Sequence, residues 1–409
     1  MSSRVVVTGM AGFSPIGNDW NSIESRLRSL KNGVSYIDGW DVYDGLNTRL
    51  GAPVTGFEHP PSFTRRKIRS MSRVSMLATA ASEIALNDAG LLGNPVLQSG
   101  RAGVSYGSST GSTEATSDFA GMLLNQSLDG VTATTYIRMM GHTAPVNIGV
   151  FFGLQGRVIP SSSACTSGSL GIGYAYEAIH YGQQDIMIAG GAEEQCATEA
   201  AVFDTLYATS TSNDTPELSQ RPFDRDRDGL VIGEGAGTLI LENRDHALKR
   251  GARIYAEIVG FGTNSDGKHV TQPSPETMKG AIRLSLADAG LEPGDIGYIS
   301  AHGTATERGD IAESQATYDV FGDGIPISAM KSYMGHTLGA CGALESWLAI
   351  EMMNNHWFAP TINLEHVDPL CAPLDYILGD GRQLDVKYVM NNNFAFGGIN
   401  TSLIFARHE

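Results

Sequence analysis

The sequence has only four cysteines among its 409 residues, and their spacing is uneven. Disulfide scaffolds and cysteine-based zinc sites need several cysteines at short, regular separations, so neither class is indicated. We expect no metal site and no cofactor, and we interpret Cys196, Cys341 and Cys371 as packing residues. The low cysteine content also favours a reducing compartment.

Long apolar runs and an excess of positive charge are absent as well. No segment approaches the roughly 20 apolar residues of a membrane span, and residues 1–9 lack the apolar region of a signal peptide. The 28 Lys and Arg residues are outnumbered by 44 Asp and Glu, for a net charge of −16. This balance disfavours binding to nucleic acid or to an anionic membrane. We therefore expect a cytoplasmic protein.

Glycine is abundant, with 49 residues, and two parts of the chain resemble each other. Residues 81–110 and 281–304 each predict a helix that stops at glycine, followed by a strand that ends in small polar residues. A strand leading into a helix also recurs, around Cys165 and after residues 326–328. We predict two duplicated α/β halves, residues 1–250 and 251–409, with the active site between them.

Cys165 lies in the run SSSACTSGS, residues 161–169, in which all of the remaining residues are small. Such a run lets a strand turn sharply into a helix and places the thiol at the helix N-terminus, where N–H groups and the dipole favour thiolate. His302 and His336 are also surrounded by small residues. Isolated cysteines and histidines are more often structural, but three in the same context indicate catalysis.

Two other motifs have competing interpretations. The G-x-S-x-G pattern at residues 107–111 is typical of a hydrolase nucleophile, but the duplication makes it the counterpart of the His302 loop, which disfavours a serine hydrolase. A basic cluster contains Arg65, Arg66, Lys67 and Arg69. Taken alone, this cluster is better explained as a solvated helix face than as a surface that steers acidic partners.

Together these segments resemble the β-ketoacyl-[acyl carrier protein] synthases, condensing enzymes of the thiolase superfamily. The likeness covers essentially the whole chain, in order: residues 5–9 (VVVTG), the Cys165 segment, 221–229 (RPFDRDRDG), 301–304 (AHGT), 331–336 (KSYMGH) and 393–398 (NFAFGG). The resemblance implies a thiolase-like fold of duplicated halves, a five-layered α/β/α/β/α sandwich. It also implies a dimer.

The resemblance assigns roles to individual residues. Cys165, His302 and His336 correspond to the Cys-His-His set of the elongating type, which condenses an acyl thioester on the cysteine with malonyl-[acyl carrier protein]. Lys331 is expected to orient a histidine, with Glu345 and Asp310 in support. Backbone N–H groups of Cys165 and Phe396 would hold the oxyanion, and Phe396 would gate acyl entry. The basic cluster becomes a docking surface for acyl carrier protein, which reverses the interpretation above.

Some segments depart from the common fatty-acid pattern. These are Ala395, where glycine is usual before the gating phenylalanine, and the segments 136–142 and 40–50. They look most like the ketosynthases of bacterial aryl polyene biosynthesis, which work as homodimers or beside a chain-length-factor-like ketosynthase. A conventional fatty acid elongation synthase is the first alternative. A noncatalytic chain-length-factor-like subunit is the second, although the intact Cys165 argues against it.

Overall fold

The computed structural model describes residues 2–408, which build one mixed sheet of eleven strands. The strands of the first half lie in the spatial order β5 (Val158–Pro160), β4 (Ala102–Gly107), β6 (Ile186–Glu193), β8 (Gly235–Asn243) and β1 (Val5–Phe13). Those of the second half follow as β9 (Ala256–Ser265), β16 (Ile399–Arg407), β15 (Tyr388–Ala395), β10 (Ile296–Ser300), β11 (Pro326–Ser328) and β13 (Asp375–Tyr376).

The two half-sheets have the same topology. Each half contains a run of five neighbouring strands. Counted from the outer edge of the sheet toward the centre, the first two pairings in each run are parallel and the next two are antiparallel. Thus β5, β4, β6, β8 and β1 correspond to β11, β10, β15, β16 and β9. The halves join where β1 pairs with β9. The predicted duplication is confirmed by this order.

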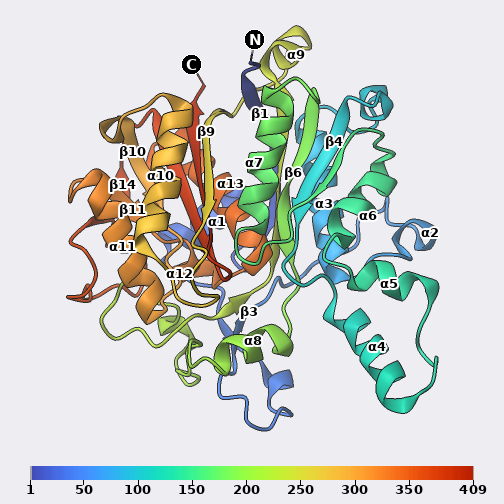
Figure 1. Cartoon of the computed structure of the whole chain (residues 1–409), viewed down its shortest axis with the longest axis horizontal. Coiled ribbons are helices and arrows are strands. Elements are labelled where there is room, and N and C mark those ends of the chain that lie inside the picture. The colour runs from blue at the N-terminus through green and yellow to red at the C-terminus, as the bar shows by residue number, and fades with distance from the viewer. Residues whose placement is uncertain (1, 409) are drawn as a thin grey trace.

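Helices complete five layers. The outer face of the first half-sheet is covered by α3 (Arg73–Asp88) and α6 (Thr143–Phe152), and that of the second by α10 (Pro275–Ala289) and α11 (Glu307–Phe321). Between the half-sheets lie α7 (Ser167–His180) and α13 (Cys341–Asn354), which contact each other and strands of both halves (Figure 1). The predicted five-layered sandwich is therefore confirmed.

The sequence of α7 explains why it occupies the central layer. The helix is apolar or small on nearly all sides, as expected for a helix packed on both faces. A Cβ at Gly168 would lie 2.9 Å from the backbone nitrogen of Ala343 in α13, and one at Gly171 would lie 2.5 Å from the carbonyl oxygen of Gly190 in β6. Glycine is therefore required for the close approach of α7 to both neighbours.

The remaining α-helices and strands surround this sandwich. They are α1 (Trp20–Arg28), β2 (Ser35–Tyr36), β3 (Leu50–Ala52), α2 (Arg65–Ile68), α4 (Thr113–Asn125), α5 (Ala133–Met139), α8 (Ala197–Asp204), β7 (Ile232–Gly233), α9 (Arg244–Lys249), α12 (Lys331–Met334), β12 (Trp357–Phe358) and β14 (Arg382–Gln383). In Figure 1, α4 and α5 project from the first half. Among residues 2–408, no helix has both the length and the apolar character needed to cross a membrane. The domain boundary at residue 250 stays a prediction.

Candidate active site

Cys165 lies in the connection between β5 and α7, two residues before the first residue of the helix. The preceding residue, Ala164, has a φ of +51°, a left-handed conformation that turns the chain sharply. The cysteine is only 4% exposed, and Ala200 and Phe203 of α8 belong to the same apolar cluster. The strand-to-helix turn expected from the small residues around Cys165 is confirmed.

His336 lies in the equivalent connection of the second half, between β11 and α13. Its Nε2 is 3.0 Å from Sγ of Cys165. The backbone N–H of Leu338 donates to Nδ1 of His336 at 3.3 Å. Because Nδ1 accepts this hydrogen bond, the neutral ring carries its proton on Nε2 and presents it to the sulfur.

His302 follows β10 and faces His336, with ring centroids 5.2 Å apart and ring planes at 88°. Nζ of Lys331 is 3.1 Å from Nδ1 of His302. An ammonium group only donates, so this Nδ1 accepts and Nε2 carries the proton. Burial and the nearby Lys331 charge hold the pKa of both histidines well below the usual range. Both rings are therefore neutral donors at Nε2.

Lys331 and Glu345 form a fully buried ion pair behind the histidines. Nζ of Lys331 is 2.5 Å from Oε1 of Glu345, and both side chains are 0% exposed. The other carboxylate oxygen of Glu345 accepts a hydrogen bond from Nδ2 of Asn393 at 2.7 Å. The expected placement of Lys331 against a histidine is thus observed, with Glu345 holding the lysine. Asn393 was not predicted to take part, although it opens one of the quoted segments.

Two buried glutamates that the sequence reasoning missed hold the loops of the site. Oε1 and Oε2 of Glu313 accept the backbone N–H groups of His302 and Gly303, each at 2.7 Å. Burial raises the pKa of Glu313 to about 8, while the two N–H donors act in the opposite direction. Oε2 of Glu193 accepts the N–H groups of Ser109 at 2.7 Å and Gly339 at 3.0 Å. Neither residue stands in a local pattern that indicates burial.

Asp310 supports the site from a distance. Its carboxylate accepts the backbone N–H groups of Phe223 at 2.7 Å and of Ala305 at 3.1 Å. Arg227 lies 3.5 Å away. Burial raises the pKa of Asp310 to about 6, and the Arg227 charge opposes this shift. Asp310 therefore joins the loop after His302 to the segment around Phe223 and has no hydrogen bond to Cys165, His302 or His336.

Burial and nearby positive charge act on the thiol of Cys165 in opposite directions. Burial raises its pKa to about 11, whereas the Lys331 charge and the backbone N–H groups of Phe396 and Cys165 act to lower it. Burial outweighs the effect of the helix N-terminus, so the resting group is a thiol, in contrast to the thiolate expected from the sequence. The N–H groups of Phe396 and Cys165 act on the sulfur itself, and their role in holding the oxyanion stays a prediction.

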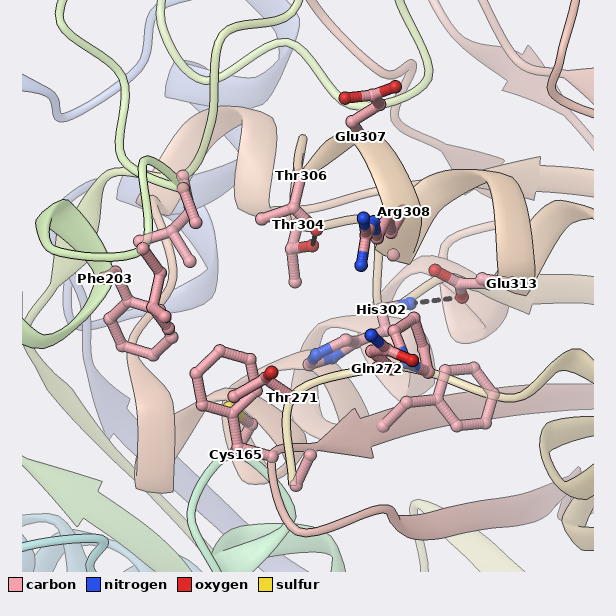
Figure 2. Close-up of a pocket in the computed structure, with 18 of the residues that line it drawn as sticks. Cys165, Phe203, Thr271, Gln272, His302, Thr304, Thr306, Glu307, Arg308 and Glu313 are labelled. Carbon is pink, nitrogen blue, oxygen red and sulfur yellow. Dashed lines mark hydrogen bonds between the residues drawn. The ribbon is translucent and has the colours of Figure 1, made fainter. Parts of the chain in front are cut away.

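Phe396 lies just beyond β15, and its ring centroid is 5.0 Å from that of Phe203. Both rings line a cavity of about 620 Å³ that also reaches Cys165, His302 and His336. Figure 2 shows threonine side chains on two sides of this cavity, Thr271 on one and Thr304 and Thr306 on the other. The gating role of Phe396 stays a prediction.

Three metal-ligating atoms come together in the site. Sγ of Cys165 and ring nitrogens of His302 and His336 lie within 4.8 Å of one another. A sulfur and two imidazoles would suit a soft or borderline ion such as Zn²⁺. The buried ammonium of Lys331 disfavours a further positive charge at this position.

The basic cluster lies apart from these residues. Arg65, Arg66 and Lys67 belong to the short, exposed helix α2, and Arg69 follows it. Nζ of Lys67 lies 4.5 Å from the ring centroid of Phe151. None of the four basic residues lines the cavity. The cluster is therefore an exposed surface feature of the first half.

Comparison with known proteins identifies the family. Residues 2–247 match the beta-ketoacyl synthase N-terminal domain, and residues 255–365 match the C-terminal domain. The chain is 37% identical over 414 residues to the 3-oxoacyl-[acyl-carrier-protein] synthase 2 of Vibrio cholerae, with 99% of both chains covered. Fold and site thus define a ketosynthase, an acyltransferase with a thiolase-like fold.

Solved structures agree with this assignment. A beta-ketoacyl synthase from Burkholderia phymatum superposes with a TM-score of 0.98 at 57% identity, covering 100% of both chains. The ishigamide ketosynthase/chain length factor superposes with a TM-score of 0.90 at 32% identity, again over 100% of both chains. The chain belongs to the β-ketoacyl synthase family.

Proposed function

We propose that this protein is a β-ketoacyl-[acyl carrier protein] synthase that joins an acyl group on Cys165 to the two-carbon unit of a malonyl thioester. The observation that carries the proposal is the 3.0 Å contact between Cys165 Sγ and His336 Nε2 at the end of the cavity. The name of the Vibrio cholerae relative supports the same reaction.

The first step loads the enzyme. The sulfur of Cys165 attacks the carbonyl carbon of an acyl thioester, the bond to the leaving sulfur breaks, and the thiol proton ends on the departing arm. Nε2–H of His336 donates toward Sγ and lowers the cost of charge on sulfur. The backbone N–H groups of Phe396 and Cys165 suit the carbonyl oxygen as it becomes negative.

The second step uses the histidines. When a malonyl thioester loses CO₂, the electron pair of the broken C–C bond passes to the thioester oxygen and leaves an enolate. Neutral His302 and His336 each present Nε2–H to this site, and such donors stabilise the oxygen as charge develops. The enolate carbon then attacks the acyl carbonyl on Cys165, and the C–S bond breaks to release the β-ketoacyl product. The electron pair of that bond stays on Sγ of Cys165, which takes up a proton from solvent to regenerate the thiol.

We further propose that the acyl chains are polyenes of aryl polyene biosynthesis, on the sequence features at residues 40–50, 136–142 and Ala395. Fatty acid elongation is the alternative, favoured by the name of the Vibrio cholerae relative. The proposed partners are acyl carrier protein and either a second copy or a chain-length-factor-like ketosynthase, as in the ishigamide pair. A cytoplasmic location is part of this proposal.

The test is the intact mass of the purified protein after incubation with saturated and polyenoyl carrier-protein thioesters, with peptide mapping of the adduct. An acyl adduct on Cys165 is expected, and preferential loading of the polyenoyl group would support polyene synthesis. Preferential loading of saturated chains would favour fatty acid elongation. If no adduct forms with the protein alone or after a chain-length-factor partner is added, the result would contradict the catalytic role and favour a noncatalytic subunit.

A further inference from the structure

Two arginines line the cavity, and they differ in their partners. The side chain of Arg227 is 2% exposed and pairs with Asp368 at 2.7 Å and with Asp310 at 3.5 Å. Arg308 is exposed, and among the described residues no carboxylate lies within ion-pair distance of its guanidinium. The guanidinium of Arg227 is therefore occupied by ion pairs within the protein. The guanidinium N–H groups of Arg308 are available to a bound molecule.

Arg308 lines the cavity beside Thr304 and Thr306 (Figure 2). It is the second residue of α11, the fifteen-residue helix that begins at Glu307. In Figure 2 its guanidinium is turned toward Thr304 and the side chain of His302, while the Glu307 carboxylate is turned to the opposite side. The positive end of the α11 dipole adds to the arginine charge at this position. In a chain of net charge −16, this is a local concentration of positive charge.

The geometry points to the phosphodiester of the arm that carries the thioester as the ligand of Arg308. This inference rests on the proposed function. A carrier-linked thioester is held on a phosphopantetheine arm, which places the reacting sulfur at one end and a phosphodiester at the other. With the thioester at Cys165, the phosphodiester must lie toward the open end of the cavity. A guanidinium binds phosphate through two parallel hydrogen bonds.

A second anion, the malonyl carboxylate, fits Arg308 less well. This carboxylate leaves as CO₂, so a cation paired with it would stabilise the ground state more than the transition state and slow the reaction. The thioester next to it must also reach Nε2 of His302 and His336, at the buried end of the cavity. We therefore infer that Arg308 selects for the arm and leaves the chemical step unchanged.

The test compares malonyl thioesters of phosphopantetheine and of pantetheine, which differ only in the phosphate. We expect Arg308→Gln to raise KM for the phosphorylated substrate about two- to fivefold, the upper part of the range for one exposed charge pair. KM for the pantetheine substrate and both kcat values should not change, and Arg308→Lys should restore part of the loss. Arg225→Gln is the matched control, because Arg225 is exposed and does not line the cavity.

Three results would overturn the inference. An equal rise of KM for both substrates would place Arg308 against the malonyl or pantetheine part. A rise seen only with intact carrier protein would place it against carboxylates of the carrier. No change of KM with any substrate would remove it from binding altogether.

A failure of the proposed function would look different, because the wild type would then condense no thioester. In that case Arg308 can still be tested by adding phosphopantetheine or pantetheine and measuring how far each one slows the alkylation of Cys165. Such protection requires only that the added molecule occupies the cavity, and it does not depend on turnover. Stronger protection by the phosphorylated arm, lost in Arg308→Gln, is expected. Equal protection by the two arms would contradict the inference.

Discussion

The connection from β5 to α7 and the connection from β11 to α13 are equivalent in the duplicated fold, yet one carries Cys165 and the other His336. In the first half, a left-handed Ala164 turns the thiol toward the centre. In the second half, Lys331 and Glu345 occupy the interior behind the imidazoles. Duplication thus supplies the geometry twice, and different residues at matching positions place a thiol on one side and an imidazole N–H donor on the other.

The loops after β4 and β10 show the same contrast. Glu193 holds the loop of the first half by accepting the N–H of Ser109, and Glu313 holds that of the second by accepting the N–H of His302. Only the second loop carries an imidazole. In its counterpart, the G-x-S-x-G segment, the hydroxyl of the motif serine, Ser109, donates to Oε2 of Glu193 at 2.5 Å. This contact explains the serine without hydrolase chemistry.

The largest effect is expected when the thiol that the first half contributes to the site is removed. Cys165→Ala should abolish covalent acyl loading and condensation, because no nucleophile remains. Malonyl decarboxylation should persist, since His302 and His336 still stabilise the enolate. Intact mass and CO₂ release measure the two activities. Cys196→Ala is the control, because Cys196 does not line the cavity, and condensed product from Cys165→Ala would refute the assignment.

The pKa of Cys165 depends on groups from both halves, because the thiol comes from the first half and Lys331 and His336 come from the second. A pKa raised to about 11 means that the thiol loses its proton only as pH rises toward that value. The rate of iodoacetamide alkylation should therefore increase about tenfold per pH unit from pH 7 to 10, read at Cys165 by peptide mapping. His336→Ala should slow the reaction further, because Nε2–H no longer donates to the sulfur. A plateau near pH 7 would instead indicate a thiolate at rest.

The substitution Lys331→Met tests the buried ion pair between Lys331 and Glu345 in the second half. The change leaves Glu345 buried without its cation, which should lower the free energy of unfolding by about 3–5 kcal/mol. Urea denaturation measures the loss. The double variant Lys331→Met with Glu345→Gln should recover part of it, because no buried charge remains unpaired. Lys279→Met is the control, because the carboxylates that pair with Lys279, Glu276 and Asp319, are exposed. A double variant no more stable than the single would contradict the argument.

The smallest expected effect concerns the exposed basic cluster of the first half. Arg65→Gln with Arg66→Gln should raise KM for carrier-linked substrates several-fold at low salt, with a smaller effect at high salt because ions screen exposed charges. KM for pantetheine thioesters should not change, since they lack the carrier. Arg26→Gln, on the exposed side of α1, is the control. An equal effect on both substrates would exclude a carrier-docking surface.

Much of the site was predictable because its signals are local. Small residues around Cys165, His302 and His336 are visible in the sequence, and the repeated helix–glycine–strand pattern indicates two related halves. Gly90 and Gly290 both have the positive φ expected at the helix ends, +66° and +65°. The functions of Glu313, Glu193 and Asn393 were not predictable, because a buried acceptor or amide is recognised only by the chain segments that surround it.

The amino-acid sequence by itself indicated the duplicated α/β halves, the family and the three side chains that meet in the site, because small residues, glycine stops and strand patterns act over a few neighbouring positions. Only the tertiary structure decided that Cys165 rests as a thiol and that both histidines carry their proton on Nε2. These properties depend on burial and on donors such as Lys331, which lies 29 residues from His302 in the chain. Electrostatic free energy depends on distance and dielectric in three dimensions, so packing sets it.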